Sequence, residues 1–381
     1  MKGLVVGCGK VGSEIARDLA ATSGFSEVVV ADAVPSNLDK VKNLRNVKTV
    51  KASLAQRPVI KRLMHHADVV CGALPGRIGF GLLEQAVDEG KNIVDISYTP
   101  KNPLLLNRRA LSNGCTVVPQ CGVAPGFTNM CVGDASQKMD RMNRVRVFVG
   151  GIPEKPEPPL NYRIVFSLDD VVNEYTRPVR IIENGTGKTV EPLSGRGLMN
   201  FPGVGKLEYF LTDGLGSLPQ TFPRVREMKE LTLRYPGHAE IIDALRRLGF
   251  FSRKRVRLEG LSVEPRRLSL EVLRKALAAG TPEDVLVLRV EVEGVNKGGR
   301  VMMSYSVVDR YDTRRSVSAM ARTTAYPCTS IAILLAKGVL TQKGVVPPEK
   351  IARDPRLFRF VLARLRERGV RVRTQFRVIG S

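Results

Sequence analysis

The sequence predicts an α/β protein with a Rossmann-type doubly wound parallel sheet and a second α+β domain whose sheet is mostly antiparallel. Two observations predict the first part. A glycine-rich turn follows an apolar run at the start of the chain, and strand-like and helix-like segments alternate up to about residue 125. A third observation predicts the second part, because beyond residue 140 apolar runs occur in pairs separated by turn residues, as in hairpins.

The glycine-rich turn occupies residues 7–12, where Gly7, Gly9 and Gly12 have G-x-G-x-x-G spacing. The apolar run 4–6 before it predicts a buried strand, and apolar residues at helical spacing after it predict a helix. A strand that turns sharply into a helix directs backbone N–H groups at one point, which suits a pyrophosphate. We expect these residues to bind a dinucleotide cofactor: Gly7, Cys8, Gly9, Lys10, Val11 and Gly12.

The second apolar run, residues 28–30, leads to Asp32, twenty residues beyond Gly12. An acidic residue at this place accepts hydrogen bonds from the ribose hydroxyls of the cofactor and repels a 2′-phosphate. Residues 33–36 offer no arginine that could bind a 2′-phosphate. The sequence therefore predicts NAD rather than NADP as the cofactor.

Further apolar runs predict strands at 47–50, 68–73, 92–96 and 116–118, with helices at 59–64, 82–87 and 104–111 between them. Ser36 is expected to cap a helix that carries Leu38, Val41 and Leu44. Because ligands lie beyond the carboxyl ends of parallel strands, we expect further cofactor contacts from residues that follow the strands: Ala73, Leu74, Pro75 and Ser97.

We expect three segments: an NAD-binding Rossmann domain at 1–125, a substrate-binding and dimerisation domain at 126–316, and a C-terminal segment at 317–381 that returns to the first domain. In the second domain a strand at 144–149 is expected to end where Gly150 to Pro153 break it. The other expected elements are hairpins at 179–190 and 285–308, a strand at 231–235, helices beginning near His238 and at 319–335, and a half-buried strand at 370–378.

The composition bounds the function classes. The formal net charge is +23, but aromatic residues do not interleave with the basic ones and no nucleic-acid motif appears, so we interpret the charge as an arginine-rich, thermophilic surface without a specific nucleic-acid partner. No apolar run reaches the ~20 residues of a membrane span, and no signal peptide is apparent. The six cysteines form no C-x-x-C pair, so we expect no metal site and a cytoplasmic location.

Four motifs together resemble the saccharopine dehydrogenase-like family. They are residues 7–12, 68–75, 94–98 and 120–129, and residues 321–327 are similar to a returning helix of that family. The resemblance implies an oxidoreductase that uses a nicotinamide cofactor on a small amino-acid substrate, and it implies a homodimer.

Two segments, 161–178 and 233–239, are most similar to the lysine 6-dehydrogenases of that family, and Ala124 stands where saccharopine-forming members usually carry an acidic residue. This resemblance implies NAD-dependent oxidative deamination of the lysine side chain to 2-aminoadipate 6-semialdehyde, which cyclises, with release of ammonia. One alternative is a reductase that condenses an amine with a semialdehyde, as saccharopine or carboxynorspermidine dehydrogenases do. The other is a nucleotide-binding protein without catalytic activity.

Individual polar residues give hypotheses with structural alternatives. His238 is interpreted either as a general base or as a helix-capping residue, and Asp170 and Glu174, four apart on a predicted helix, either bind an amine or face solvent. The expected catalytic residues are His238, Tyr98 and Asp170. The expected substrate-binding residues are Tyr98, Arg163, Glu174, Tyr175, Arg177 and Thr323, with Arg234, Arg322 and Asp213 as further candidates. Asp95 is expected to be structural, and His65 and His66 to lie on the surface.

Overall fold

The computed structural model describes residues 1–53, 56–164, 167–277 and 281–379, and the chain divides into two compact units. Unit 1 comprises Met1–Lys138, Gly216–Thr221 and Ala321–Val372. Unit 2 comprises Met139–Leu215, Phe222–Met320 and Arg373–Ser381. The chain leaves and re-enters each unit, so neither is one continuous stretch of sequence.

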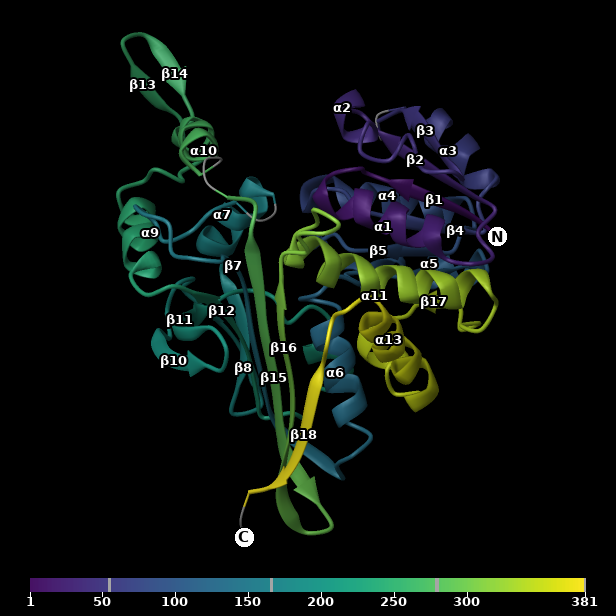
Figure 1. The fold of residues 1–381 in the computed structure, drawn as a ribbon. Helices are drawn as coiled ribbons and strands as arrows, with labels where there is room; N and C mark the ends of the chain where they lie inside the picture. The colour runs from purple at the N-terminus through teal and green to yellow at the C-terminus, as the bar shows by residue number, and fades with distance from the viewer. Residues whose placement is uncertain (54–55, 165–166, 278–280, 380–381) are drawn as a thin grey trace. The chain divides into compact units, whose positions relative to one another are not determined.

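Unit 1 is built on a seven-stranded parallel sheet with the order β17-β6-β5-β4-β1-β2-β3 (Figure 1). Its strands are β1 (Lys2–Val6), β2 (Glu27–Asp32), β3 (Val47–Lys51), β4 (Val69–Gly72), β5 (Ile93–Asp95), β6 (Thr116–Val118) and β17 (Gly344–Val345). The chain adds β2 and β3 on one side of β1 and then continues with β4 on the other side. This reversal is the place where doubly wound sheets bind ligands, and the predicted parallel fold is confirmed.

The described helices of unit 1 include helices on both faces of this sheet. They are α1 (Lys10–Ala21), α2 (Pro35–Leu38), α3 (Arg57–His65), α4 (Gly76–Asp88), the 3-10 helix η1 (Pro103–Leu106), α5 (Asn107–Ser112), α6 (Phe127–Ala135), α8 (Leu218–Thr221), α12 (Pro348–Ile351), α13 (Pro355–Glu367) and most of α11 (Ala319–Ala336). The expected helix from Ser36 to Leu44 is wrong in extent, because α2 ends at Leu38 and its N-cap is Val34, with no capping side chain.

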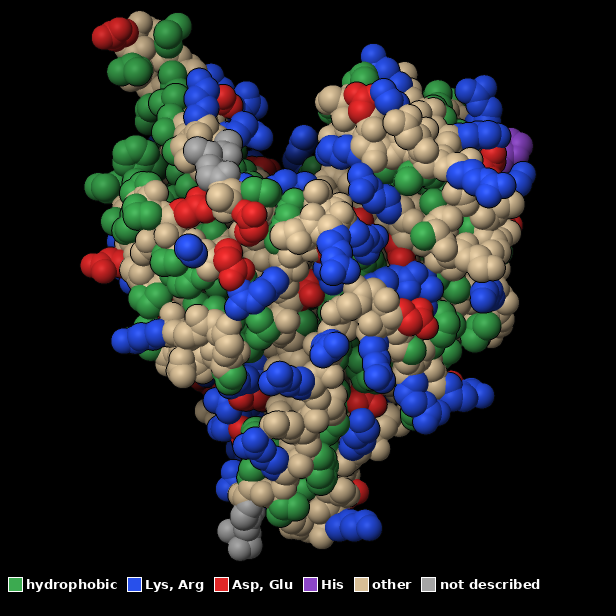
Figure 2. All heavy atoms as spheres, viewed as in Figure 1, with side chains coloured by type: hydrophobic (Ala, Val, Ile, Leu, Met, Phe, Trp, Pro, Cys, Tyr) green, Lys and Arg blue, Asp and Glu red, His purple; other side chains and the backbone are tan. Residues whose placement is uncertain are grey.

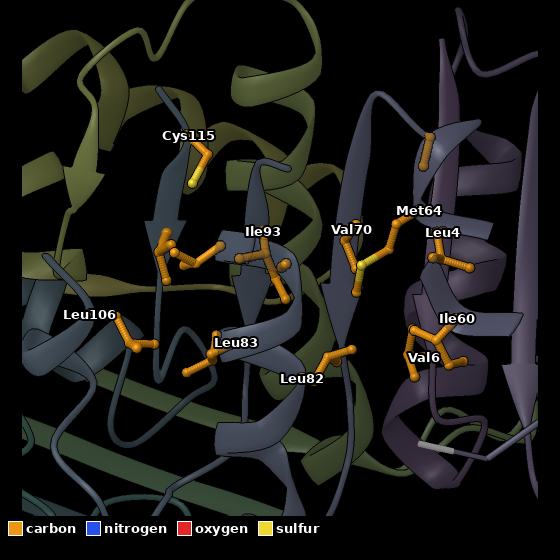
Figure 3. Packing of buried hydrophobic residues seen from close by; sticks show 14 of the residues in the cluster. Leu4, Val6, Ile60, Met64, Val70, Leu82, Leu83, Ile93, Leu106 and Cys115 are labelled. Atoms are coloured by element: carbon orange, nitrogen blue, oxygen red, sulfur yellow. The ribbon is translucent and has the colours of Figure 1, made fainter. Parts of the chain in front are cut away.

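One hydrophobic core cluster of unit 1 lies where α3, α4 and α5 pack on one face of the sheet (Figure 3). Leu4 and Val6 of β1 belong to this cluster, whereas the equally buried Val5 between them does not, because side chains of a strand alternate between its faces. Ile60 and Met64 of α3 meet them from the helix layer. Burying each such side chain stabilises the fold by roughly 1.5–3 kcal/mol.

The opposite face is joined by buried polar contacts among α1, α11 and α13. The Tyr326 hydroxyl donates to Glu14 Oε1 at 2.7 Å, and the Thr329 hydroxyl donates to Asp18 Oδ2 at 2.5 Å. Arg364 donates to the same Asp18 oxygen at 3.4 Å. These contacts hold the helix that follows the glycine-rich turn against the C-terminal helices of unit 1.

Unit 2 contains a nine-stranded, mostly antiparallel sheet whose main path is β10-β11-β12-β7-β15-β16-β18. Its strands are β7 (Arg141–Pro153), β8 (Val179–Glu183), β9 (Thr186–Val190), β10 (Gly197–Phe201), β11 (Gly205–Leu211), β12 (Glu227–Arg234), β15 (Asp284–Asn296), β16 (Gly299–Arg310) and β18 (Arg373–Val378). Among the described strand pairs of this sheet, β12–β7 is the parallel one, and the others are antiparallel. Unit 2 also has helices α7 (Leu168–Thr176), α9 (His238–Arg247) and α10 (Pro265–Ala276) and a separate hairpin of β13 (Val256–Leu258) and β14 (Leu261–Val263).

Two sequence-based expectations about unit 2 are wrong. Gly150 to Pro153 do not break a strand, because β7 continues to Pro153 and pairs there with β15. Gly150 is required by close packing, since a Cβ at this position would lie 2.4 Å from the Leu233 carbonyl oxygen of β12. The tail strand β18 is not half-buried, because both of its faces carry exposed residues; among the described strands it pairs only with β16 of unit 2.

The surface carries the positive charge in a dispersed form. Lys and Arg side chains are spread over the visible face of both units rather than gathered in one patch (Figure 2). None of the described helices is long and apolar enough to cross a membrane.

Candidate nucleotide and substrate sites

The glycine-rich turn of unit 1 has the geometry expected for a phosphate-binding loop. Gly7 has φ +98°, and a Cβ there would lie 2.3 Å from the Ala73 carbonyl oxygen, so the loops after β1 and β4 touch at the reversal of strand order. A Cβ at Gly12 would lie 1.9 Å from the Gly7 carbonyl oxygen. Gly9 is the N-cap of α1, and a Cβ there would meet no described atom within 4 Å.

The N-terminus of α1 lies directly after the glycine-rich turn. Its first turn contains no acidic residue, and no side chain caps it. Helix N-termini of this kind attract phosphate through their backbone N–H groups and dipole. Lys10 is exposed and Val11 half-buried at the start of the helix. The open space beside Gly9 is consistent with the predicted pyrophosphate site, which stays a prediction.

Asp32 ends β2 next to this turn. Its Oδ2 accepts from the Cys8 N–H at 2.6 Å, and its Oδ1 accepts from the Val34 N–H at 2.7 Å. The Cys8 thiol in turn donates to the Asn37 carbonyl at 3.2 Å, and burial raises its pKa to about 11, so it stays protonated. A carboxylate accepts about four hydrogen bonds, so Asp32 both fixes the turn and retains acceptor capacity for ribose hydroxyls.

The loops after β4 and β5 are linked by Ser97. Its hydroxyl lies 2.9 Å from the Leu74 carbonyl oxygen and 3.2 Å from Asp95 Oδ2, and its N–H donates to Asp95 Oδ1 at 2.8 Å. Ala73 and Leu74 are half-buried and Pro75 is exposed. The structure thus brings Ala73, Leu74 and Ser97 together beside the glycine turn.

Tyr98 and Thr323 also belong to unit 1. Tyr98 is half-buried directly after the β5 loop, and Thr323 is 3% exposed in α11, next to the buried Arg322. The other expected catalytic and substrate-binding residues all lie in unit 2. His65 and His66 are exposed, as expected.

The buried part of unit 2 contains a polar cluster centred on Arg234, whose side chain is only 2% exposed. Arg234 Nη2 donates to Glu174 Oε2 at 3.0 Å, Nε donates to the Tyr175 hydroxyl at 3.4 Å, and the guanidinium lies 4.7 Å from the Tyr162 ring centroid. Arg234 is thus paired with a carboxylate within the protein, and its role in binding a substrate carboxylate stays a prediction. Only the arginine of this ion pair is fully buried, because the Glu174 side chain is 32% exposed.

His238 is fully buried at the start of α9 and both ring nitrogens have partners. Nδ1 lies 2.8 Å from the Leu160 carbonyl, which can only accept, so Nδ1 carries the hydrogen and Nε2 accepts from the Tyr175 hydroxyl at 2.9 Å. Burial and the nearby Arg234 lower the pKa of His238 to about 3. The N-cap of α9 is Gly237, so His238 is not the capping residue. Its role as a general base stays a prediction.

Partly exposed carboxylates surround this cluster. Burial raises the pKa of Asp170, which is half-buried one turn before Glu174, and burial also raises the pKa of Glu174 against the opposing charge of Arg234. Asp213 accepts from Arg180 Nε at 2.9 Å, and Arg177 lies 3.9 Å from it. Asp170 and Glu174 form the partly exposed rim of the cluster, whereas the Asp213 side chain is only 5% exposed.

Arg163 is half-buried, and its Nη1 lies 4.0 Å from Glu157 Oε1. Such a separation is a weak ion pair, so Arg163 stays a candidate for binding a substrate carboxylate. Residues 165 and 166, which belong to the segment 161–178, lie outside the described residues.

Sequence reasoning missed Glu230 and Tyr162. Glu230 is 5% exposed and accepts from the Thr212 hydroxyl at 2.7 Å, and burial raises its pKa to about 8. The available signal was the alternation of β12, which places Glu230, Thr232 and Arg234 on one face. Tyr162 is part of the segment 161–178 but carries no pattern of its own.

Family models match both parts of the chain. The saccharopine dehydrogenase NADP binding domain matches residues 4–118, and the saccharopine dehydrogenase C-terminal domain matches residues 122–370.

Three relatives illustrate the range of lengths. The alpha-aminoadipic semialdehyde synthase of Arabidopsis thaliana is 24% identical over 233 residues, which cover 56% of this chain and 21% of the relative. The mitochondrial enzyme of Rattus norvegicus with the same name is 22% identical, over 66% of this chain and 29% of the relative. The chain thus spans less than a third of these two proteins. The carboxyaminopropylagmatine dehydrogenase of Synechocystis is 22% identical, over 97% of this chain and 96% of the relative.

A solved structure has the same fold. Apo saccharopine dehydrogenase (L-Glu forming) of Saccharomyces cerevisiae matches 99% of this chain and 100% of that chain with a TM-score of 0.80 at 16% identity. At this identity the likeness concerns the fold alone. With the two family-model matches, however, the nucleotide-binding sheet and the second domain are both assigned, and the chain belongs to the saccharopine dehydrogenase family of nucleotide-binding oxidoreductases.

Proposed function

We propose that the protein oxidises the side-chain amine of an amino acid with NAD, and that L-lysine is its substrate. One observation carries the proposal. The segments 161–178 and 233–239, which have the lysine 6-dehydrogenase-like sequence, jointly form the buried cluster of unit 2, where Glu174 and Tyr175 meet Arg234 and His238. These two segments are thus one structural feature rather than two unrelated similarities.

The preference for NAD is part of the proposal, although the matched family model is named for NADP. Asp32 supports NAD, because its carboxylate stands at the end of β2 and is held there by the Cys8 and Val34 N–H groups. A fixed negative charge at this place repels a 2′-phosphate. When bound, NAD supplies the hydride acceptor.

We propose that residues of unit 1 bind this cofactor. The backbone of residues 7–12 and the N-terminus of α1 bind the pyrophosphate, Asp32 binds the ribose, and Ala73 to Pro75 with Ser97 line the next loop.

The reaction requires a neutral amine, because an ammonium has no lone pair with which to form an imine. The carbon next to the nitrogen loses a hydride, the nitrogen loses a proton, and water then replaces the imine nitrogen to give an aldehyde and ammonia. The half-buried Asp170 and Glu174 at the rim are the proposed contacts for the substrate amine. The pKa of each is raised by burial, so each can exchange a proton closer to neutrality than an ordinary carboxyl group.

A second candidate is a dehydrogenase of a condensed amine, of which the Synechocystis relative is an example by name. Its similarity over 97% of this chain and 96% of its own length favours this alternative. Ala124 favours lysine, because it replaces the acidic residue usual in saccharopine-forming members.

Product analysis separates the two. The protein is supplied with NAD or NADP and, in parallel, with lysine, saccharopine or carboxyaminopropylagmatine, and NAD(P)H absorbance and ammonia are measured. Turnover of lysine with equimolar ammonia is the expected result. Turnover of a condensed amine without ammonia would replace the proposal by the second candidate, and cofactor binding without turnover of any amine would favour a nucleotide-binding protein.

A further inference from the structure

Asp95 lies at the end of β5 in unit 1 and is completely buried. Two glycines leave the space that it and its partner need. A Cβ at Gly72 would lie 1.9 Å from Asp95 Oδ2, and a Cβ at Gly79 would lie 2.4 Å from Ser97 Oγ. The Asp95–Ser97 pair therefore requires glycine at both positions, because any side chain there would clash with it.

The hydrogen atoms of this pair can be counted. The Ser97 N–H donates to Asp95 Oδ1. The single hydroxyl hydrogen of Ser97 has two acceptors within reach, the Leu74 carbonyl at 2.9 Å and Asp95 Oδ2 at 3.2 Å. If Asp95 is ionised, this hydrogen can serve only one of them. If Asp95 is a neutral acid, its O–H donates to Ser97 Oγ and the Ser97 hydrogen is free to bind Leu74, so every group is satisfied.

The surroundings favour the neutral acid. Burial raises the pKa of Asp95 to about 7, against the opposing effect of the two Ser97 hydrogen bonds. The titratable groups that interact with Asp95 are the thiols of Cys121, after β6, and Cys328, in α11, and Cys71 of β4 interacts with both. The pKa of Cys121 and of Cys328 is itself raised, so both stay uncharged at neutral pH.

We propose that Asp95, as a neutral acid, is a positioning residue for the cofactor: through Ser97 it holds the Leu74 carbonyl, and its ionisation releases the loop at 73–75. The proposal rests on the proposed nucleotide site, because that loop touches Gly7 and Gly12 of the phosphate turn. A Cβ at Gly12 would also lie 3.2 Å from the Ala73 side chain, so a shift of the loop alters the space around the turn.

The test compares NAD affinity by calorimetry on the acid and alkaline sides of pH 7 in wild type, Asp95→Asn and Ser97→Ala. Asn is the matched variant, because its amide donates to Ser97 Oγ as the neutral acid does but cannot ionise. We expect wild-type affinity to fall about threefold to tenfold at alkaline pH, the range of one hydrogen bond. Asp95→Asn should bind tightly at both pH values, and Ser97→Ala weakly at both. An unchanged pH step in Asp95→Asn, or wild-type affinity in Ser97→Ala, would overturn the proposal.

A second measurement keeps the two proposals distinguishable and needs no cofactor. Carbon-13 NMR of labelled aspartate carboxyl groups, with Asp95→Asn used for assignment, reports the titration of Asp95 itself. Ionisation near pH 7 is the expected result. Ionisation near the ordinary value with normal NAD binding would refute the role of Asp95 alone. Failure of the wild type to bind NAD at any pH would refute the nucleotide site, and the role of Asp95 with it.

Discussion

The expected role of a single residue in this protein depends more on its contacts than on its amino-acid type. Arg234 is one of 60 basic residues in the sequence, yet it is almost completely buried and paired with Glu174. Asp32 is one of 37 acidic residues and stands where a ribose is expected. Such differences cannot be seen in composition, but each leads to a substitution whose outcome follows from the contacts.

Asp32→Asn tests the cofactor preference. The substitution removes the negative charge and retains one oxygen that can accept from the turn, so we expect the ratio of kcat/KM for NADP to that for NAD to rise by roughly tenfold or more, since like-charge contacts cost several kcal/mol. Steady-state kinetics with both cofactors measures it. Asp39→Asn is the control, because Asp39 is exposed and forms a local ion pair with Lys42. An unchanged ratio would remove Asp32 from cofactor selection.

His238→Phe separates the catalytic from the structural hypothesis. The folded-state pKa of about 3 lies below the unfolded value near 6.5, so the unfolded state binds the extra proton. The contribution of the neutral His238 to stability is therefore complete above pH 6.5 and is lost as the pH falls toward 3.

We expect His238→Phe to be less stable than wild type by about 1–3 kcal/mol at neutral pH, because it leaves buried polar groups on Leu160 and Tyr175 unpaired. The difference should shrink as the pH falls, and urea unfolding at several pH values measures it. A variant as stable as wild type that has lost turnover would instead support the general-base hypothesis.

At the scale of elements, substitutions at two glycines of the turn are expected to affect cofactor binding and folding differently. Gly9→Ala should leave the fold intact, since its Cβ meets no described atom, yet weaken NAD binding by about tenfold or more because the methyl group occupies the phosphate space. Gly12→Ala should impair folding, since its Cβ would lie 1.9 Å from the Gly7 carbonyl oxygen.

Thermal unfolding and calorimetry distinguish the two variants. Gly81→Ala in α4 is the control, because it has open space in a helix and should gain roughly 0.5–1 kcal/mol in stability without any effect on NAD. If Gly9→Ala bound NAD like wild type, the pyrophosphate would have to lie elsewhere.

The same elements explain how far sequence reasoning reaches. Strand and helix periodicity predicted the parallel sheet, and the turn residues could be predicted because their geometry is local. Gly150 misled the prediction, because its cause is the approach of β12 rather than a turn. The pairing of Glu174 with Arg234 joins residues 60 apart, so only the tertiary structure could reveal it.

At the scale of the whole molecule, the formal charge of +23 opposes self-association. We expect apolar contacts to hold the homodimer that the family resemblance implies. Figure 2 shows hydrophobic side chains at the surface over α9, β13 and β14. Of the sixteen large hydrophobic residues that are exposed in the described chain, eight lie between residues 241 and 272: Ile241, Leu248, Phe250, Val256, Leu258, Leu261, Leu268 and Val272.

The β13–β14 hairpin is the part of this surface where a contact with another surface would stabilise the fold most. Its strands have three residues each, and Leu258 and Leu261 are 59% and 68% exposed. Isolated two-stranded hairpins are marginally stable in water. The segment also carries the basic residues Arg253, Lys254, Arg255 and Arg257. Their positive charges would repel those of a second copy, and added salt weakens this repulsion. We therefore predict that a second copy of the chain covers this hairpin in the homodimer that the family resemblance implies.

Light scattering during gel filtration tests this prediction. The wild type should be dimeric, with the dimer favoured by added salt, and the double variant Leu258→Ser, Leu261→Ser should be monomeric. Leu105→Ser is the control, because Leu105 is 74% exposed but lies in unit 1. A dimer that persists in the double variant would place the interface on another surface. A dimer that dissociates with salt would show that ion pairs, not apolar contacts, overcome the net charge.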